Sequence, residues 1–428
     1  MYDTTFAQSF ASTAGAALKV FTKLDPSTRR NFWILFAAGL LFWSALAAHL
    51  PTLPLYIQAT GANEQTVGIV MGSFAIGLLA SRQLLAKLAD FRGRKLVLLI
   101  GMTAVAVAPL GYLVTNYIPA LMLIRAFHGI SIAAFALAYS ALVIDLSPPQ
   151  HRGELIGYMS LVNPIGLALG PAIGGFLQEW YGFAPMFLAA AGIGFVGLGC
   201  TAQVKETAVV KPLATGEQIQ FWRLLGDPRI RVPAIILLMV GLTFGTLSTF
   251  APLYIREIGA DLNTGLFYTA IAIASFSIRL IVGPLSDRHG RGVFISLSLV
   301  FYVVSMLLLW QARDTATLLL AAAMEGSGAG ILIPMIAALM ADRSQPHERG
   351  RTFGVCMIGF DIGIAMAGPM LGTVAGYIGY RGIFGICVGL SVIGLAIFLT
   401  QSGKSLSNSL RFALGQGRDA YAVRLEHQ

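Results

Sequence analysis

Residues 161–177 read LVNPIGLALGPAIGGFL. The stretch is apolar enough for a lipid bilayer, and Gly166, Gly170 and Gly174 recur at every fourth position, so they stack on one face of a helix. A face without side chains lets a neighbouring backbone approach closely, which is a common mode of helix association in membranes. Pro171 removes one backbone donor and crowds the preceding turn, so we expect the helix to bend there. The stretch predicts a closely packed membrane helix.

The same pattern returns late in the chain as GFDIGIAMAGPMLGTVAG, residues 359–376. Its small and bend-forming positions are Gly359, Gly363, Gly368, Pro369, Gly372 and Gly376. Two such helices about two hundred residues apart indicate a duplicated transporter, because internal repeats are typical of transporter folds.

The composition excludes a water-soluble protein. The chain of 428 residues is 56% hydrophobic and only 11% charged, whereas soluble domains carry about 25% charged residues. The net charge of +9 is dispersed along the chain, so we assign it to membrane topology rather than to nucleic-acid binding. The cysteines and histidines have no metal-ligand spacing, and neither a nucleotide-binding motif nor a catalytic constellation is present. We therefore expect no metal, no cofactor and no enzymatic activity.

Twelve apolar runs reach the length of about 20 residues that a membrane-spanning helix needs. They cover 32–57, 67–86, 96–115, 118–145, 154–177, 183–203, 231–256, 265–284, 293–311, 315–342, 351–378 and 381–401. The predicted fold is an all-α membrane protein with two six-helix bundles, residues 31–203 and 231–402. Residues 204–230 form the linker between them, and residues 403–428 form a terminal tail. Residues 1–30 fit an interfacial helix or a disordered tail equally well.

The basic residues predict the orientation in the membrane. With a cytoplasmic N-terminus, cytoplasmic segments hold 23 of the 29 Lys and Arg residues. The opposite side holds Arg256, Arg313 and Arg381, and three more arginines lie inside spans. This asymmetry predicts a multi-pass protein of the cell (inner) membrane with both termini cytoplasmic.

The two halves also align with each other. The spacing from Arg82 to Asp90 recurs from Arg279 to Asp287 at an offset of 197, and Asp145 matches Asp342 at the same offset. The chain therefore consists of two repeats of six helices. Arg82 and Arg279 lie about 12 Å from their loop aspartates at helical rise, so snorkelling to the interface explains them better than function does.

The loop AKLADFRGRK (86–95) and its repeat GPLSDRHGRG (283–292) resemble the signature loop of the major facilitator superfamily. The resemblance covers essentially the whole chain, although Ala86 and Phe91 depart from the family pattern. It implies that these loops latch the outward-facing state; the alternative is that they only supply positive charge on the cytoplasmic side. The positions concerned are Asp90, Gly93, Arg94, Lys95, Asp287, Arg288, Gly290 and Arg291.

Two further motifs support the resemblance. Arg125 and His128, in LMLIRAFHGIS, match the family's R-x-x-q-G pattern with histidine in the glutamine position. The opening stretch matches the antiporter motif at Gly166, Gly170, Pro171, Gly174 and Gly175. This motif is similar to that of exporters which exchange drugs or metabolites for protons, with generic helix packing as the alternative.

Only two acids lie deep inside spans, Glu325 and Asp361. By the repeat offset Glu325 is the counterpart of His128, and the resemblance places both spans, 118–145 and 315–342, along a central cavity. Glu325 would then face Arg125 and His128. A carboxyl group in a medium of low dielectric constant holds its proton more tightly, and a nearby arginine weakens that hold. Our hypothesis is that Glu325 carries the proton with the help of Arg125 and His128, that Asp361 is the second candidate, and that a static hydrogen bond is the alternative for Glu325.

The substrate cavity is predicted less sharply. Candidate lining residues are His49, Tyr139, Asn163, Phe244 and Tyr268, each of which could equally pack in a core or face lipid. The sequence indicates a monomeric, proton-coupled exporter of a small, partly apolar compound, working by alternating access in membrane lipid without nucleic acid. The alternatives are an uptake symporter, facilitator or lipid flippase of the same fold, and a receptor or scaffold that has lost transport.

Overall fold

A computed structural model describes residues 21, 24–148, 150–206, 226–345 and 348–423, except for the side chains of Pro284 and Asp287. The described residues are helical, with turns and short connections and without strands. Most of the expected N-terminal segment 1–30 and of the linker 204–230 lies outside the described residues.

The described residues of the first half form eight helices: α2 (Pro26–Ala47), α3 (Leu53–Ala59), α4 (Glu64–Arg92), α5 (Arg94–Val114), α6 (Ile118–Leu146), α7 (Arg152–Met159), α8 (Val162–Tyr181) and α9 (Phe183–Gln203). Those of the second half form six: α11 (Pro228–Glu257), α12 (Thr264–His289), α13 (Arg291–Gln311), α14 (Thr315–Asp342), α15 (Arg349–Gln401) and α16 (Leu406–Ala413).

Eleven of the described helical segments are long and apolar enough to cross a membrane. α15 contains two spans, because the backbone at Gly379 has φ +73° and breaks the helical geometry there. The predicted twelve spans are therefore present. α8 continues through Pro171, since a proline removes a single hydrogen bond. The helix of the predicted span 154–177 is instead interrupted at residues 160–161, between α7 and α8.

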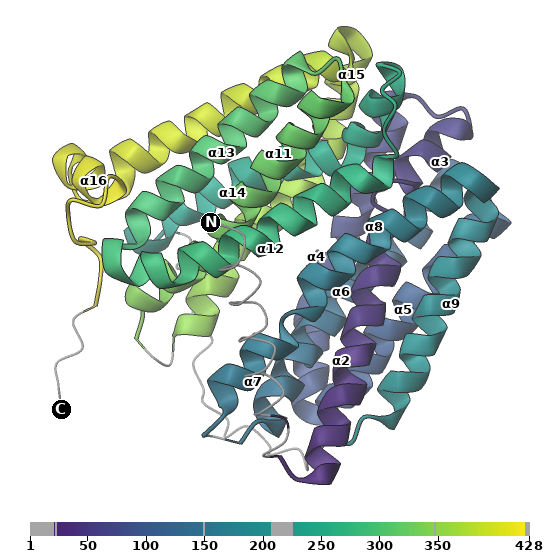
Figure 1. Cartoon of the computed structure of the whole chain (residues 1–428), viewed down its shortest axis with the longest axis horizontal. Helices are drawn as coiled ribbons and strands as arrows, with labels where there is room; N and C mark the ends of the chain where they lie inside the picture. The colour runs from purple at the N-terminus through teal and green to yellow at the C-terminus, as the bar shows by residue number, and fades with distance from the viewer. Residues whose placement is uncertain (1–20, 22–23, 149, 207–225, 346–347, 424–428) are drawn as a thin grey trace, which may run out of the picture.

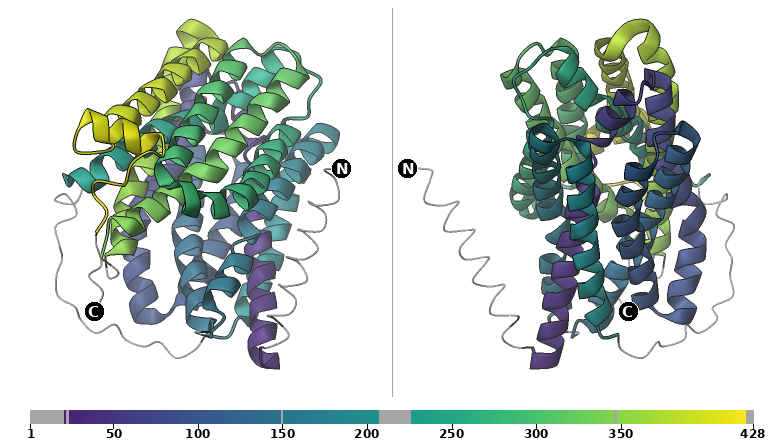
Figure 2. Two further views of the ribbon diagram at one scale, coloured as in Figure 1. Left: turned by 60° about the vertical axis from the view of Figure 1, so that its left-hand side comes forward. Right: turned by 90° about the vertical axis from the view of Figure 1, so that its right-hand side faces the viewer.

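The long helices form two bundles, α2–α9 and α11–α15 (Figures 1 and 2). We call the side that carries the turns at Gly93 and Gly290, together with α7 and α16, the basic side. The bundles lie together near α3 and the bend of α15, and diverge toward α7 and α16 (Figure 1). The helices of the two bundles therefore meet on the opposite side and spread apart on the basic side.

The glycines of the opening stretch determine how closely α8 approaches its neighbours. A Cβ atom added at Gly170 or Gly174 would overlap the backbone oxygen of Ser44 or Ala48 in α2. Gly175 faces Gly265 of α12 in the other bundle. In the second repeat, Gly368 of α15 lies against Gly68 of α4, also across the two bundles. The glycine faces thus bring backbones together both within and between bundles.

Candidate functional site

One ion pair joins the two bundles in the interior of the described structure. Arg82 Nη1 on α4 donates to Asp361 Oδ2 on α15 at 2.5 Å. The Asp361 side chain is 11% exposed and that of Arg82 is 42% exposed. The sequence singled out Asp361, but it did not provide a partner, and Arg82 was interpreted as an interfacial residue. Only the packing of α4 against α15 brings the two together.

On the closed side, hydrogen bonds between the bundles form a rim. Arg256 Nη2 donates to Gln178 Oε1 at 2.9 Å, and Gln58 Nε2 donates to Tyr380 Oη at 3.1 Å. Asn263 also donates to the carboxylate of Glu179. These contacts involve exposed or part-buried side chains, so they can break when the bundles separate at this side.

A polar cluster lies buried inside the first bundle. Arg125 and His128 lie on α6, His49 follows α2, and Tyr112 lies on α5. Tyr112 Oη is 3.3 Å from His128 Nδ1, which is 3.5 Å from Arg125 Nη1, and the imidazoles of His49 and His128 meet edge to face. The Arg125 guanidinium also lies 4.4 Å from the centroid of Phe74. Arg125 Nε and the Nε2 atoms of both histidines lack hydrogen-bond partners. These three nitrogen atoms could therefore form further hydrogen bonds.

Glu325 occupies the equivalent place in the second bundle. It is fully buried on α14, and neither carboxyl oxygen has a hydrogen-bond partner. Ser305 of α13 donates its hydroxyl proton to the carbonyl of Ala321 at 2.9 Å, while Tyr302 and Cys387 are ionisable neighbours of Glu325. An unpaired charged carboxylate in such surroundings would cost several kcal/mol, so the neutral acid fits this conformation.

The structure does not bring Glu325 and Arg125 together. Each lies in the core of its own bundle, and the partners of Arg125 are Phe74 and His128 of the first bundle. No contact joins Glu325 to Arg125 or His128 among the described residues, so the expected arrangement stays a prediction. Glu325 is enclosed in the second bundle without a hydrogen-bond partner.

A cavity of about 190 Å³ lies between α2, α6, α7 and α8. Ala136, Ser140 and Ile144 recur at intervals of four on the exposed face of α6 that lines it. Its other lining residues are Trp43, Phe135, Tyr139, Val143, Ile156, Met159, Ser160, Val162 and Asn163. Tyr139 is held by a hydrogen bond from its hydroxyl to the Met159 carbonyl at 2.9 Å. The cavity is apolar and aromatic with a few neutral polar groups.

The five residues predicted to line the substrate cavity do not lie together. Tyr139 and Asn163 line this cavity, whereas His49 belongs to the buried polar cluster. Phe244 stacks on Phe360, and Tyr268 is buried with its hydroxyl directed at the carbonyls of Leu247 and Ser248. The sequence analysis missed Ser140. Its spacing of four residues from Ala136, which places both on one face of α6, is the signal that could have identified it.

The turns after α4 and α12 each hold an arginine beside an acid of the same bundle. Arg94 pairs with Asp90 at 3.2 Å and with Asp145 at 3.3 Å, and Arg291 pairs with Asp342 at 3.5 Å. Lys95 Nζ donates to the Ala202 carbonyl at 2.7 Å. Gly93 and Gly290 have φ of +103° and +85°, a conformation that favours glycine. Arg288 lies in the last turn of α12, and the side chain of Asp287 is outside the described part.

The fold and these motifs agree with the comparison to known families. The model of the Major Facilitator Superfamily matches residues 34–283 and 236–416. The chain belongs to the Major Facilitator Superfamily. It is a multi-pass membrane transporter, not an enzyme, and among the described residues no group of acids, histidines and cysteines could hold a metal ion.

Two relatives have names that refer to multidrug resistance. The multi-drug resistance efflux pump PmrA homolog of Lactococcus lactis is 25% identical, over 87% of this chain and 92% of its own. The multidrug resistance protein MdtG of Salmonella typhimurium is 24% identical, over 85% and 93%. The fold is shared with the nucleoside transporter NupG, at a TM-score of 0.73 and 15% identity over 86% of this chain and 99% of that one. A bacterial homolog of the lysosomal transporter Spinster has a TM-score of 0.69 and 13% identity, over 87% and 96%.

Proposed function

We propose that this transporter exports a small, partly apolar compound across the inner membrane in exchange for protons. The basic side is then cytoplasmic, both termini lie there, and a monomer in membrane lipid performs the cycle. The relative named as an efflux pump supports export. The conformation with an opening on the basic side is the one that would admit a compound from the cytoplasm.

The ion pair between Arg82 and Asp361 is the observation that carries the proposal. It joins α4 to α15, two helices that belong to different bundles and must move apart or slide when the open side changes. Protonation of Asp361 removes one charge of the pair and so weakens the contact between the bundles. A proton that binds at this position therefore acts on the same equilibrium that alternates access.

Glu325 is the second acid of the proposal. It is enclosed in the second bundle without a hydrogen-bond partner, so it can lose its proton only in a conformation that opens a path to water. This requirement links its proton exchange to the conformational cycle. Arg125 and His128 would stabilise the state in which polar groups in the first bundle become hydrated, and the turns at Gly93 and Gly290 would latch the outward-facing state.

The cavity beside Trp43 and Tyr139 indicates the kind of substrate. Its walls supply aromatic faces and aliphatic side chains, and Asn163, Ser140 and Ser160 supply neutral hydrogen-bonding groups. No charged side chain of the described residues lines it. This surface suits a planar or lipophilic group and gives no charge-assisted contact to a carboxylate or phosphate.

Proteoliposomes with the pH-sensitive dye pyranine inside test the proposal. We would impose a pH gradient, add lipophilic fluorescent dyes such as ethidium outside, and record dye and proton movement together. The expected result is dye transport that follows the gradient and proton flow in the opposite direction. Dye movement that is independent of the gradient would reject proton coupling, and proton flow in the same direction as the dye would identify a symporter.

A further inference from the structure

The N-termini of α5 and α13 are equivalent in the two repeats but are satisfied differently. Arg94 begins α5 and Arg291 begins α13, each after a glycine with positive φ. At α5 the carboxylate of Glu206 accepts hydrogen bonds from the backbone N–H groups of Arg94 at 2.5 Å and Lys95 at 3.2 Å. The first bundle therefore places an anion of its own chain on this helix terminus, where the helix dipole favours negative charge.

The corresponding place at α13 differs in sequence. The repeat offset puts Gly403 where the first half has Glu206. A Cβ atom added at Gly93 would meet the Glu206 carboxylate, whereas one added at Gly290 would meet nothing within 4 Å. The second repeat thus has open space beside Gly290, while the end of α16 packs against Gly292, the second residue of α13.

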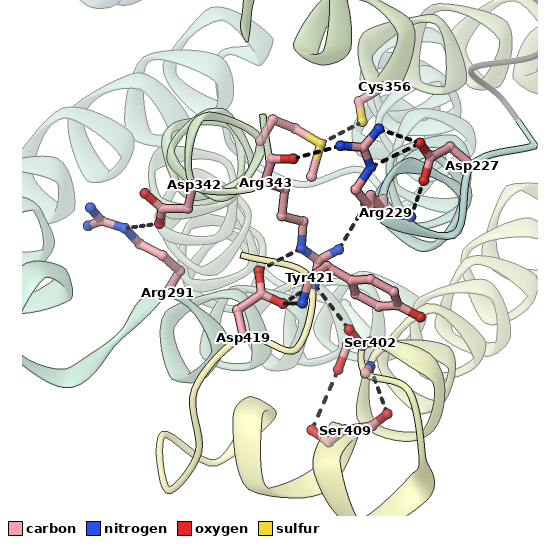
Figure 3. Close-up of polar contacts among 12 residues, drawn as sticks. Asp227, Arg229, Arg291, Asp342, Arg343, Cys356, Ser402, Ser409, Asp419 and Tyr421 are labelled. Atoms are coloured by element: carbon pink, nitrogen blue, oxygen red, sulfur yellow. Dashed lines mark hydrogen bonds and ion pairs between the residues drawn. The ribbon is translucent and has the colours of Figure 1, made fainter. Parts of the chain in front are cut away.

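A cavity of about 480 Å³ occupies this space. It is bounded by the N-termini of α13 and α15, the end of α14, and the chain segment after α16. Its two aspartates are already engaged: Asp342 pairs with Arg291, and Asp419 accepts two hydrogen bonds from Arg343, at 2.7 and 2.9 Å (Figure 3). The lining arginines Arg349 and Arg418 have no ion pair among the described residues, so the described lining side chains carry a net positive charge.

Ser344 gives independent evidence of a ligand. Its side chain lines the cavity, is 3% exposed, and its hydroxyl oxygen has no hydrogen-bond partner. A buried hydroxyl without a partner costs free energy that a ligand oxygen would recover. It can donate to an anion that also accepts from the backbone N–H groups of α13.

We propose that this cavity binds a phosphate group. The first residues of α13 supply backbone donors, as helix N-termini commonly do for phosphates, Arg349 and Arg418 supply charge, and Ser344 supplies a buried donor. The phosphate belongs either to the headgroup of an anionic lipid or to a soluble phosphate compound. The bound group takes the place that Glu206 fills in the first repeat, and it ties the segment carrying Arg418 to the turn at Gly290.

The full-length protein in neutral detergent tests this site. Retained phosphatidylglycerol would be counted by native mass spectrometry, with phosphatidylcholine as the neutral lipid, and inorganic phosphate binding would be measured by equilibrium dialysis. The double variant Arg349→Gln/Arg418→Gln changes two exposed side chains and should fold normally. Arg152→Gln is the matched control, because Arg152 is the repeat counterpart of Arg349 and its half already contains Glu206.

We expect the double variant to weaken binding at least about tenfold and Arg152→Gln to leave it unchanged. Loss of phosphatidylglycerol alone would assign the site to lipid, and loss of inorganic phosphate binding would assign it to a soluble ligand. Equal binding by all three proteins, or no binding of either ligand to the unmodified protein, would overturn the proposal. A second variant, Ser344→Ala, should weaken binding without a change in melting temperature; unchanged binding would exclude Ser344 as a donor.

Discussion

Arg82 and Asp361 form an ion pair between α4 and α15, and these helices come from different halves of the chain. The Asp361 side chain is nearly enclosed, so its charge is stabilised mainly by this arginine. A contact of this kind is sensitive both to protonation and to separation of the bundles. The protonation state of Asp361 therefore affects how the two bundles pack against each other.

The variant Asp361→Asn should uncouple transport from the pH gradient. It keeps the size of the side chain but cannot exchange a proton, so we expect gradient-driven transport to fall at least about tenfold, which corresponds to about 1.4 kcal/mol. Transport would be measured in proteoliposomes with and without the gradient. Asp261→Asn, in the exposed connection before α12, is the control. Gradient-driven transport by Asp361→Asn at the rate of the control would contradict the role of this acid.

Glu325→Gln distinguishes the two acids. The glutamine is neutral and similar in shape, so the buried site should tolerate it and the melting temperature should change little. If Glu325 carries the proton, substrate exchange without a gradient persists while gradient-driven transport is lost. If Glu325→Gln behaves like the unmodified protein and Asp361→Asn does not, the proton is carried at the contact between the bundles.

The contact between Gly68 and Gly368 predicts a shift in conformation. A methyl group at Gly68 would overlap the carbonyl oxygen of Gly368, and such overpacking costs about 1–3 kcal/mol. Gly68→Ala should therefore disfavour the state that is open on the basic side by at least about fivefold. Gly376→Ala is the control, because a Cβ atom there meets nothing within 4 Å.

This shift can be measured by maleimide labelling of a Ser140→Cys variant, since Ser140 is exposed in the present conformation. Labelling should slow in the background of Gly68→Ala and remain unchanged with Gly376→Ala. Equal labelling rates in the two backgrounds would show that the glycine contact does not control the equilibrium.

Filling the cavity of the first bundle should weaken substrate binding. Ser140→Phe adds a ring to the exposed face of α6 beside Trp43 and Tyr139, so we expect KM for lipophilic dyes to rise several-fold with little change in expression. Val196→Phe, on the exposed surface of α9, is the control. A KM that responds equally to both changes would argue that the substrate binds elsewhere.

The ion pair between Arg343 and Asp419 should contribute strongly to stability. Arg343 is 1% exposed and Asp419 is 9% exposed, and loss of one partner leaves a buried charge uncompensated. Asp419→Asn should therefore lower the free energy of unfolding by about 3 kcal/mol, seen as a lower melting temperature in detergent. Asp261→Asn should leave the melting temperature unchanged, and a similar value for both variants would show that the C-terminal segment is loosely held.

The spans were predictable because membrane helices must be long and apolar, and the repeat was predictable because its motifs recur at one offset. Tyr139 and Asn163 line a cavity, whereas Tyr268 lies in the core, and the role of these residues in substrate binding stays a prediction. The partnership between Arg82 and Asp361 could not be predicted, since it depends on how two helices 279 positions apart pack together. The C-terminal tail likewise carried no signal for the burial of Asp419 against Arg343.

The sequence by itself determined the twelve-helix architecture, the two repeats and the family, because hydrophobic length, charge distribution and local motifs are properties of the chain alone. The tertiary structure decided which polar groups meet. It enclosed Glu325 and Arg125 in separate bundles, joined Arg82 to Asp361 between them, and left the N-terminus of α13 without the carboxylate that caps α5. The physical reason is that electrostatic partnership depends on distances of a few ångströms in space, and these distances are fixed only when the helices pack.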